Sequence, residues 1–237
     1  MSRRLKIVVV IGAFAAAAVV GGPWVYINVF REPAPESFLD QATSTSLVSM
    51  SSTSVLDTPS TTVAVVDPTG VWNVTSGSQV GYRVNEVLFG QKVTAVGRTS
   101  SVTGTITIEN SSVTTGEFIV DMTTVRSDEP KRDAQFESRI MDVINYPSAT
   151  FVLTSPIPLP ADAAAVVTTY VGEGDLTLRG VTKRVPVSVV SEIRDGSIVV
   201  SGEVTITFAD WSIPNPSIPG ISTEDFGVLE FQLQFGR

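Results

Sequence analysis

The sequence predicts a mainly β protein whose strands form one antiparallel sheet, either closed into a barrel or folded into a sandwich. Apolar and polar residues alternate along short segments, which is the pattern of strands with one buried face. About eight such segments follow one another, separated by Gly, Asn and Asp turns. A repeating βαβ pattern is missing, so a parallel sheet is not expected. A barrel of that size holds either its own side chains or one slender ligand.

The first element in chain order is a membrane helix, predicted over residues 1–30. Arg3, Arg4 and Lys6 precede an uncharged run over residues 7–30, which is long enough to cross about 30 Å of hydrocarbon. The basic flank predicts that the N-terminus stays in the cytoplasm and that the rest of the chain is extracytoplasmic. The alternative is a secretory signal peptide, cleaved after the small residues at 15–18. Either interpretation places the C-terminal domain outside the cytoplasm, in a bacterial cell envelope or beyond it.

Residues 31–69 are predicted to be a flexible, disordered linker. Between residues 41 and 69, 14 of the 29 residues are Ser or Thr, and apolar residues show almost no period. Such a composition buries too little surface to offset the entropy of ordering the chain.

Residues 70–237 form the predicted β domain. The alternating apolar residues of its strands, in chain order, are Val80, Tyr82 and Val84; Ile106 and Ile108; Phe118, Val120 and Met122; Phe151 and Leu153; Leu176 and Leu178; Val185, Val187 and Val189; Val204, Ile206 and Phe208; and Leu229, Phe231, Leu233 and Phe235. The last segment alternates most regularly, because Glu230, Gln232 and Gln234 separate its apolar residues.

A densely charged segment over residues 128–151 interrupts the strands, and we expect a short helix from about Pro130 to Met141. Proline suits the first turn of a helix, and Ser127 or Asp128 can cap it. Phe136 and Ile140 are four residues apart and therefore share a face that can lie against the barrel.

The composition excludes most catalytic and metal chemistry. The chain has no Cys and no His, which removes disulfides, thiol nucleophiles, zinc-thiolate sites and the commonest general base. A net charge of −8 speaks against nucleic-acid binding. Within the charged segment, basic residues alternate with the carboxylates, which favours structural ion pairs over a catalytic carboxylate pair. We therefore expect no enzyme activity, no metal site and no cofactor.

Several motifs resemble those of the YceI-like family of exported lipid-binding proteins. They are Lys131-Arg132-Asp133 with Phe136 and Arg139, Asn145-Tyr146-Pro147, Ala149-Thr150-Phe151, the run from Gly174 to Thr182, and the strand from Glu230 to Phe235. The resemblance spans residues 70–235 and implies a lipocalin-like antiparallel barrel with a helical insert beside its mouth. It also implies a long isoprenoid lipid, such as a quinone or a polyprenyl lipid, bound inside. Many members carry a His near the first strand, whereas residues 77–86 contain none here, which puts the lipid's head group in question.

The resulting hypothesis is extracytoplasmic binding, sequestration or transport of an isoprenoid lipid in the barrel. The alternative is a cell-surface protein-interaction module whose barrel is filled by its own side chains, and interior volume separates the two. The apolar candidates for the ligand-binding cavity are Tyr82, Val84, Phe118, Val120, Met122, Phe136, Ile140, Phe151, Leu153, Leu176, Leu178, Ile206, Phe208, Trp211, Leu229, Phe231 and Leu233.

Overall fold

The computed structural model describes residues 32–51, 67–160, 168–194 and 196–237, together with Gly22, Val25, Ile27 and Val29. Most of the predicted membrane helix over residues 1–30, and residues 52–66 of the predicted linker, lie outside the described residues. Within the part of the chain that the structure describes, no helix is both long and apolar enough to cross a membrane.

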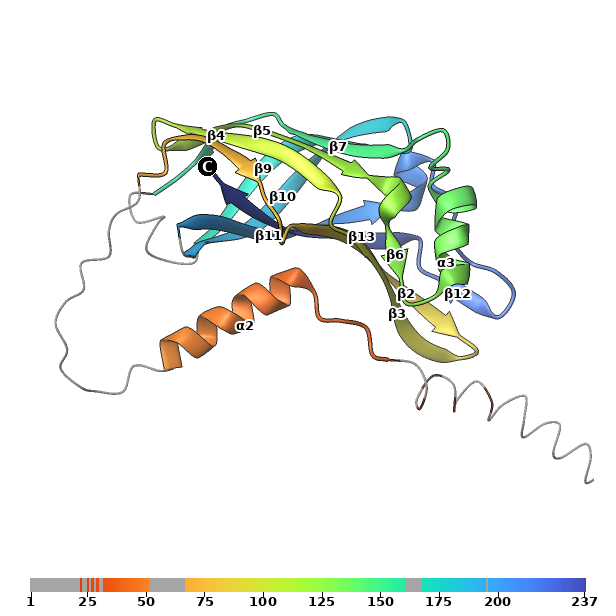
Figure 1. The fold of residues 1–237 in the computed structure, drawn as a ribbon. Helices are drawn as coiled ribbons and strands as arrows, with labels where there is room; N and C mark the ends of the chain where they lie inside the picture. The colour runs from red at the N-terminus through yellow and green to blue at the C-terminus, as the bar shows by residue number, and fades with distance from the viewer. Residues whose placement is uncertain are drawn as a thin grey trace, which may run out of the picture.

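Eight antiparallel strands form a closed ring, which confirms the predicted barrel over a sandwich (Figure 1). Pairs between Asn73 and Gly236 and between Val74 and Phe235 close it. The ring strands, in spatial order, are β1 (Gly70–Val74), β4 (Val102–Glu109), β5 (Ser112–Asp121), β7 (Ser148–Leu153), β9 (Thr168–Leu178), β10 (Val181–Arg194), β11 (Ser197–Thr207) and β13 (Phe226–Gly236).

A β-hairpin extends the barrel wall along the part of β13 that does not pair with β1. Strand β13 pairs with β2 (Gln79–Leu88) over residues 228–232, and β2 pairs with β3 (Gln91–Thr99). The remaining short elements are β6 (Arg126–Ser127) beside β3, β8 (Ile157–Pro158) beside β5, β12 (Ile221–Thr223) beside β2, and the 3₁₀ turns η2 (Met122–Thr124) and η4 (Phe208–Trp211).

Three aromatic rings pack against one another inside the barrel. Phe118 lies 6.4 Å from Phe151 and 6.0 Å from Phe235, measured between ring centroids. Gly174 makes room for this cluster, because a Cβ atom there would lie 2.1 Å from the Phe151 ring. The glycine therefore lets a large ring lie across the backbone of β9.

The helical insert forms as α3 (Pro130–Gln135) followed by the π-helical turn η3 (Phe136–Ile140). Its cap differs from the prediction, because Glu129 caps the helix by accepting from the Lys131 N–H at 3.2 Å. The hydroxyl of Ser127 instead donates to Asp133 at 2.6 Å, and the Asp128 carboxylate accepts from Arg132. Because Ser127 and Asp128 are engaged in those bonds, the Glu129 carboxylate is the group that accepts from a free N–H of the first helical turn.

Helix α2 (Phe38–Ser51) lies in the segment predicted to be a flexible linker, where the Ser/Thr-rich composition predicts no helix. In Figure 1 it runs along the outside of the barrel beside β11 and β13. Phe38 is only 3% exposed, and the Arg98 guanidinium lies 3.9 Å from the centre of its ring. Residues 32–51, here called the strap, thus contact strands that lie far away in the sequence.

Candidate functional site

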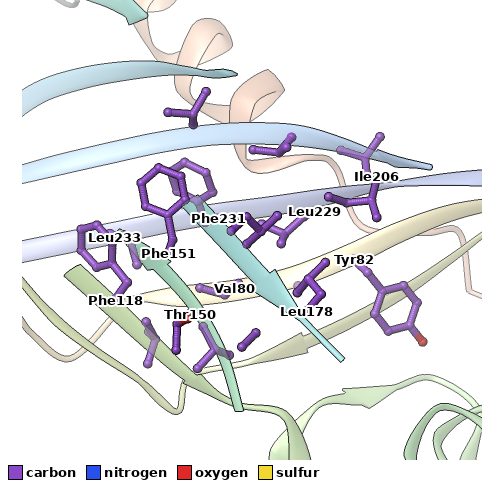
Figure 2. Close-up of a pocket in the computed structure, with 18 of the residues that line it drawn as sticks. Val80, Tyr82, Phe118, Thr150, Phe151, Leu178, Ile206, Leu229, Phe231 and Leu233 are labelled. Atoms are coloured by element: carbon purple, nitrogen blue, oxygen red, sulfur yellow. The ribbon is translucent and has the colours of Figure 1, made fainter. Parts of the chain in front are cut away.

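The barrel contains a cavity of about 320 Å³, within the size range of small-molecule sites. All eight ring strands except β1 contribute lining residues, and the hairpin β2–β3 and the helical insert complete the wall. Figure 2 shows ring and branched aliphatic side chains from several strands converging on this space. Alternation along each strand places one apolar residue in two on the inner face, which explains why so many meet here.

The structure brings the predicted cavity residues together, with one exception. The lining includes Tyr82, Val84, Phe118, Val120, Met122, Phe136, Ile140, Phe151, Leu153, Leu176, Leu178, Ile206, Phe208, Leu229, Phe231 and Leu233. Whether these side chains contact a ligand stays a prediction.

Trp211 is the exception and does not line the cavity. It ends the turn η4, where the strand alternation of β11 has stopped and Ser212 adopts a left-handed conformation with φ of 54°. Its ring is 3% exposed, its Nε1 donates to the Leu176 carbonyl at 3.5 Å, and the Lys183 amino group lies 5.8 Å from the ring centre. Apolar character alone therefore does not separate a core residue from a lining residue.

Other lining residues were not among the candidates. Val80, Ile106, Ile108, Val187, Val189, Val204 and Phe235 belong to the same alternating segments. Ala95 on β3 and Tyr170 on β9 lie in stretches not predicted as strands, although the β-branched residues beside each of them signal one. Glu86 and Arg132 also line the cavity, and no apolar pattern could have found them.

Tyr82, Glu86 and Arg132 form what we call the polar end of the cavity. Arg132 Nη2 lies 3.7 Å from Glu86 Oε2, and Arg132 Nη1 donates to the Asp128 carboxylate. The Tyr82 ring stacks on Phe136, with 5.2 Å between centroids and an angle of 13°. The charged segment thus carries structural ion pairs, as its alternating signs predict, but one of its cations also reaches the cavity.

The protonation states at the polar end follow from burial and charge. Burial raises the pKa of the Tyr82 hydroxyl well above its usual range, so the phenol stays protonated. Burial alone would lower the pKa of Arg132, but the carboxylates of Glu86 and Asp128 raise it overall. Within the described ranges, no cluster of three or more acidic residues could hold a metal ion. The site therefore offers a mostly apolar interior with its charged groups at one end.

Comparisons with known proteins agree with this architecture. The model of the YceI-like domain matches residues 72–235. A polyisoprenoid-binding domain from Saccharophagus degradans, implicated in plant cell wall breakdown, is 15% identical, with a TM-score of 0.54 over 70% of this chain and 98% of that one. BcnA of Burkholderia cenocepacia is 18% identical, with a TM-score of 0.50 over 65% of this chain and 95% of that one.

At these identities the two solved structures show a shared fold and no more. The search of curated proteins found no match for the chain. The family model, in contrast, spans more than half of the sequence, including every ring strand apart from the first two residues of β1 and the last residue of β13. The chain therefore belongs to the YceI-like domain family.

Proposed function

We propose that this protein binds a long isoprenoid lipid, of quinone or polyprenyl type, inside the barrel and sequesters or carries it. The observation that carries the proposal is the apolar cavity enclosed by the closed sheet. An isoprenoid tail needs only a dry apolar space, because each buried methylene contributes about 0.8 kcal/mol. The polyisoprenoid-binding domain of Saccharophagus degradans, which shares the fold, supports the same interpretation.

The cavity also favours lipid binding over the alternative of a protein-interaction module. That alternative requires a barrel filled by its own side chains, whereas about 320 Å³ of the interior is open. The chain carries no His and no Cys, and the lining is almost wholly apolar, which supports binding without catalysis.

For the location, the proposal is an extracytoplasmic domain held at the membrane by the helix predicted over residues 1–30. Its support is the sequence, where basic residues precede a long uncharged run. Cleavage of that segment would give a secreted form instead. A carrier suits this ligand class, because an isoprenoid tail cannot cross water unprotected.

The direct test is to purify the full chain from membranes in detergent, extract it with organic solvent and analyse the extract by mass spectrometry. We expect an isoprenoid lipid in the extract, or binding of added menaquinone or polyprenol after removal of the endogenous lipid. Absence of both would refute the proposal.

A variant that fills the cavity sharpens this test. Gly116 on β5 lines the cavity, and a Cβ atom there would make only ordinary contacts, the nearest at 3.4 Å to Leu153 Cβ. We expect the leucine side chain of Gly116→Leu to occupy space that the lipid needs and to weaken lipid binding by about tenfold or more. A tenfold loss corresponds to about 1.4 kcal/mol of binding free energy. The matched control is Glu117→Leu on the outward face of the same strand, which should bind lipid normally. Equal lipid binding by both variants would contradict a ligand inside the barrel.

A further inference from the structure

The cavity holds two charged lining residues among the described part of the chain, and both lie at its polar end. They are Glu86 and Arg132, whose side chains are 12% and 17% exposed. Figure 2 shows Tyr82, from the same strand as Glu86, apart from Phe118, Phe151 and Phe231, with its hydroxyl pointing away from those rings. An amphiphilic ligand would therefore place its tail among the rings and its head group at the polar end.

The charge at this end is unfavourable for an anion. Arg132 is paired with Glu86 and with Asp128, so its positive charge is already balanced. Asp133, one residue further along α3, adds a third carboxylate close enough to act on the Tyr82 hydroxyl. Two carboxylates thus pair with the one guanidinium and a third acts on the neighbouring Tyr82 hydroxyl, so a buried phosphate would meet both their repulsion and its own desolvation cost.

Neighbouring cations do not reverse this balance. Arg139 is exposed and donates to the carbonyls of Asn215 and Pro216, at 3.1 and 3.0 Å. Arg126 is largely exposed as well and pairs with Glu137 at 2.8 Å. Neither residue lines the cavity, whereas phosphate sites in proteins present Arg or Lys directly to the anion.

The same groups suit a neutral head group. The Tyr82 hydroxyl and the Arg132 guanidinium are hydrogen-bond donors, and the Glu86 carboxylate is an acceptor. A lipid hydroxyl can accept from the first two and donate to the third, and a quinone carbonyl can accept from either donor. On these grounds, and resting on the proposed lipid binding, we propose that the polar end selects isoprenoids with a neutral, hydrogen-bonding head group and discriminates against isoprenoid phosphates.

Two probes with the same tail test this proposal. The full chain in detergent, cleared of endogenous lipid, is titrated with geranylgeraniol and with geranylgeranyl monophosphate, and binding is followed by mass spectrometry of the washed complex. We expect the alcohol to bind at least about tenfold more tightly. Equal or tighter binding of the phosphate would overturn the proposal. If neither probe binds, the proposed function itself fails, so the two failures are distinguishable.

A charge variant tests whether the polar end is the cause. Glu86→Gln removes one carboxylate and releases part of the Arg132 charge, so we expect the ratio of phosphate affinity to alcohol affinity to rise severalfold. The matched control, Glu117→Gln, makes the same charge change on the outer wall and should leave the ratio of affinities as in the original chain. If both variants change the ratio equally, the polar end is not the selecting site. If Glu86→Gln does not fold, the comparison of the two probes on the unaltered chain still decides whether the protein prefers the alcohol to the phosphate.

Discussion

Asp121 is the last residue of β5 and caps the turn η2, whose first residue, Met122, lines the cavity. Its Oδ1 accepts from the Thr123 N–H at 2.9 Å and from the Thr123 hydroxyl at 2.6 Å. These two hydrogen bonds hold the pKa of Asp121 below its usual value although the group is exposed. The bond from the Thr123 hydroxyl has the larger effect, and the bond from the Thr123 N–H adds to it. A single exposed residue thus caps the turn that follows the strand.

This lowered pKa predicts a pH dependence. A carboxyl group whose pKa is lower in the folded protein stabilises it above the unfolded pKa, and that stabilisation is lost as the pH falls through the folded pKa. We expect Thr123→Val, which removes the hydroxyl bond and keeps the N–H bond, to raise the Asp121 pKa toward its usual value. Titration of the Asp121 side-chain carbon by NMR measures this directly. An unchanged pKa would show that the hydroxyl is not responsible.

At the scale of elements, Glu230 joins the barrel wall to the strap. It is 1% exposed and lies between Arg83 and Arg98, at 2.7 and 2.8 Å. Each arginine then donates to a strap carbonyl, Arg83 to Pro35 and Arg98 to Glu36, the second at 2.7 Å. The carboxylate therefore orients both guanidinium groups that hold the strap.

Replacing Glu230 should destabilise the barrel and release the strap together. Glu230→Gln leaves two cations side by side without their counter-charge, and we expect a loss of about 3 kcal/mol, the lower range for a broken buried ion pair because both arginines keep some exposure. Chemical denaturation measures the loss, and limited proteolysis within residues 32–51 reports the release. Glu203 is the matched control, because it lies opposite Glu230 in the β11–β13 register and is exposed. Equal effects of Glu230→Gln and Glu203→Gln would contradict this role.

The elements differ in how far the sequence predicts them, and the reason is the range of the forces involved. Alternation is local, so it predicts β5 and β13 and the inward side chains of Phe118 and Phe231. The strap is ordered by Arg83, Arg98 and Glu230, whose proximity exists only once β2, β3 and β13 are paired. The reach of Arg132 into the cavity likewise depends on where α3 packs, which no local pattern encodes.

At the scale of the whole molecule, the strap joins the barrel close to the polar end of the cavity. Glu32, Pro33 and Pro35 share a surface pocket of about 230 Å³ with Asp128, and Asp128 in turn holds Arg132. The β4–β5 turn lies at the opposite end of the barrel from α3 (Figure 1). If the proposed membrane helix over residues 1–30 is correct, only residue 31 separates it from the strap, and the polar end must then face the membrane.

This orientation can be measured, because the chain has no Cys and single labelling sites are easily introduced. Lys131 on α3 and Glu109 beside the β4–β5 turn are both exposed, so Lys131→Cys and Glu109→Cys can carry a fluorophore without disturbing the interior. With the full chain in vesicles that contain nitroxide-labelled lipid, we expect much stronger quenching at position 131. Adding Phe38→Ala, which removes the ring under Arg98, should loosen the strap and bring the two signals closer together. Stronger quenching at position 109 would place the polar end away from the bilayer and would require lipid to enter the barrel from the opposite side.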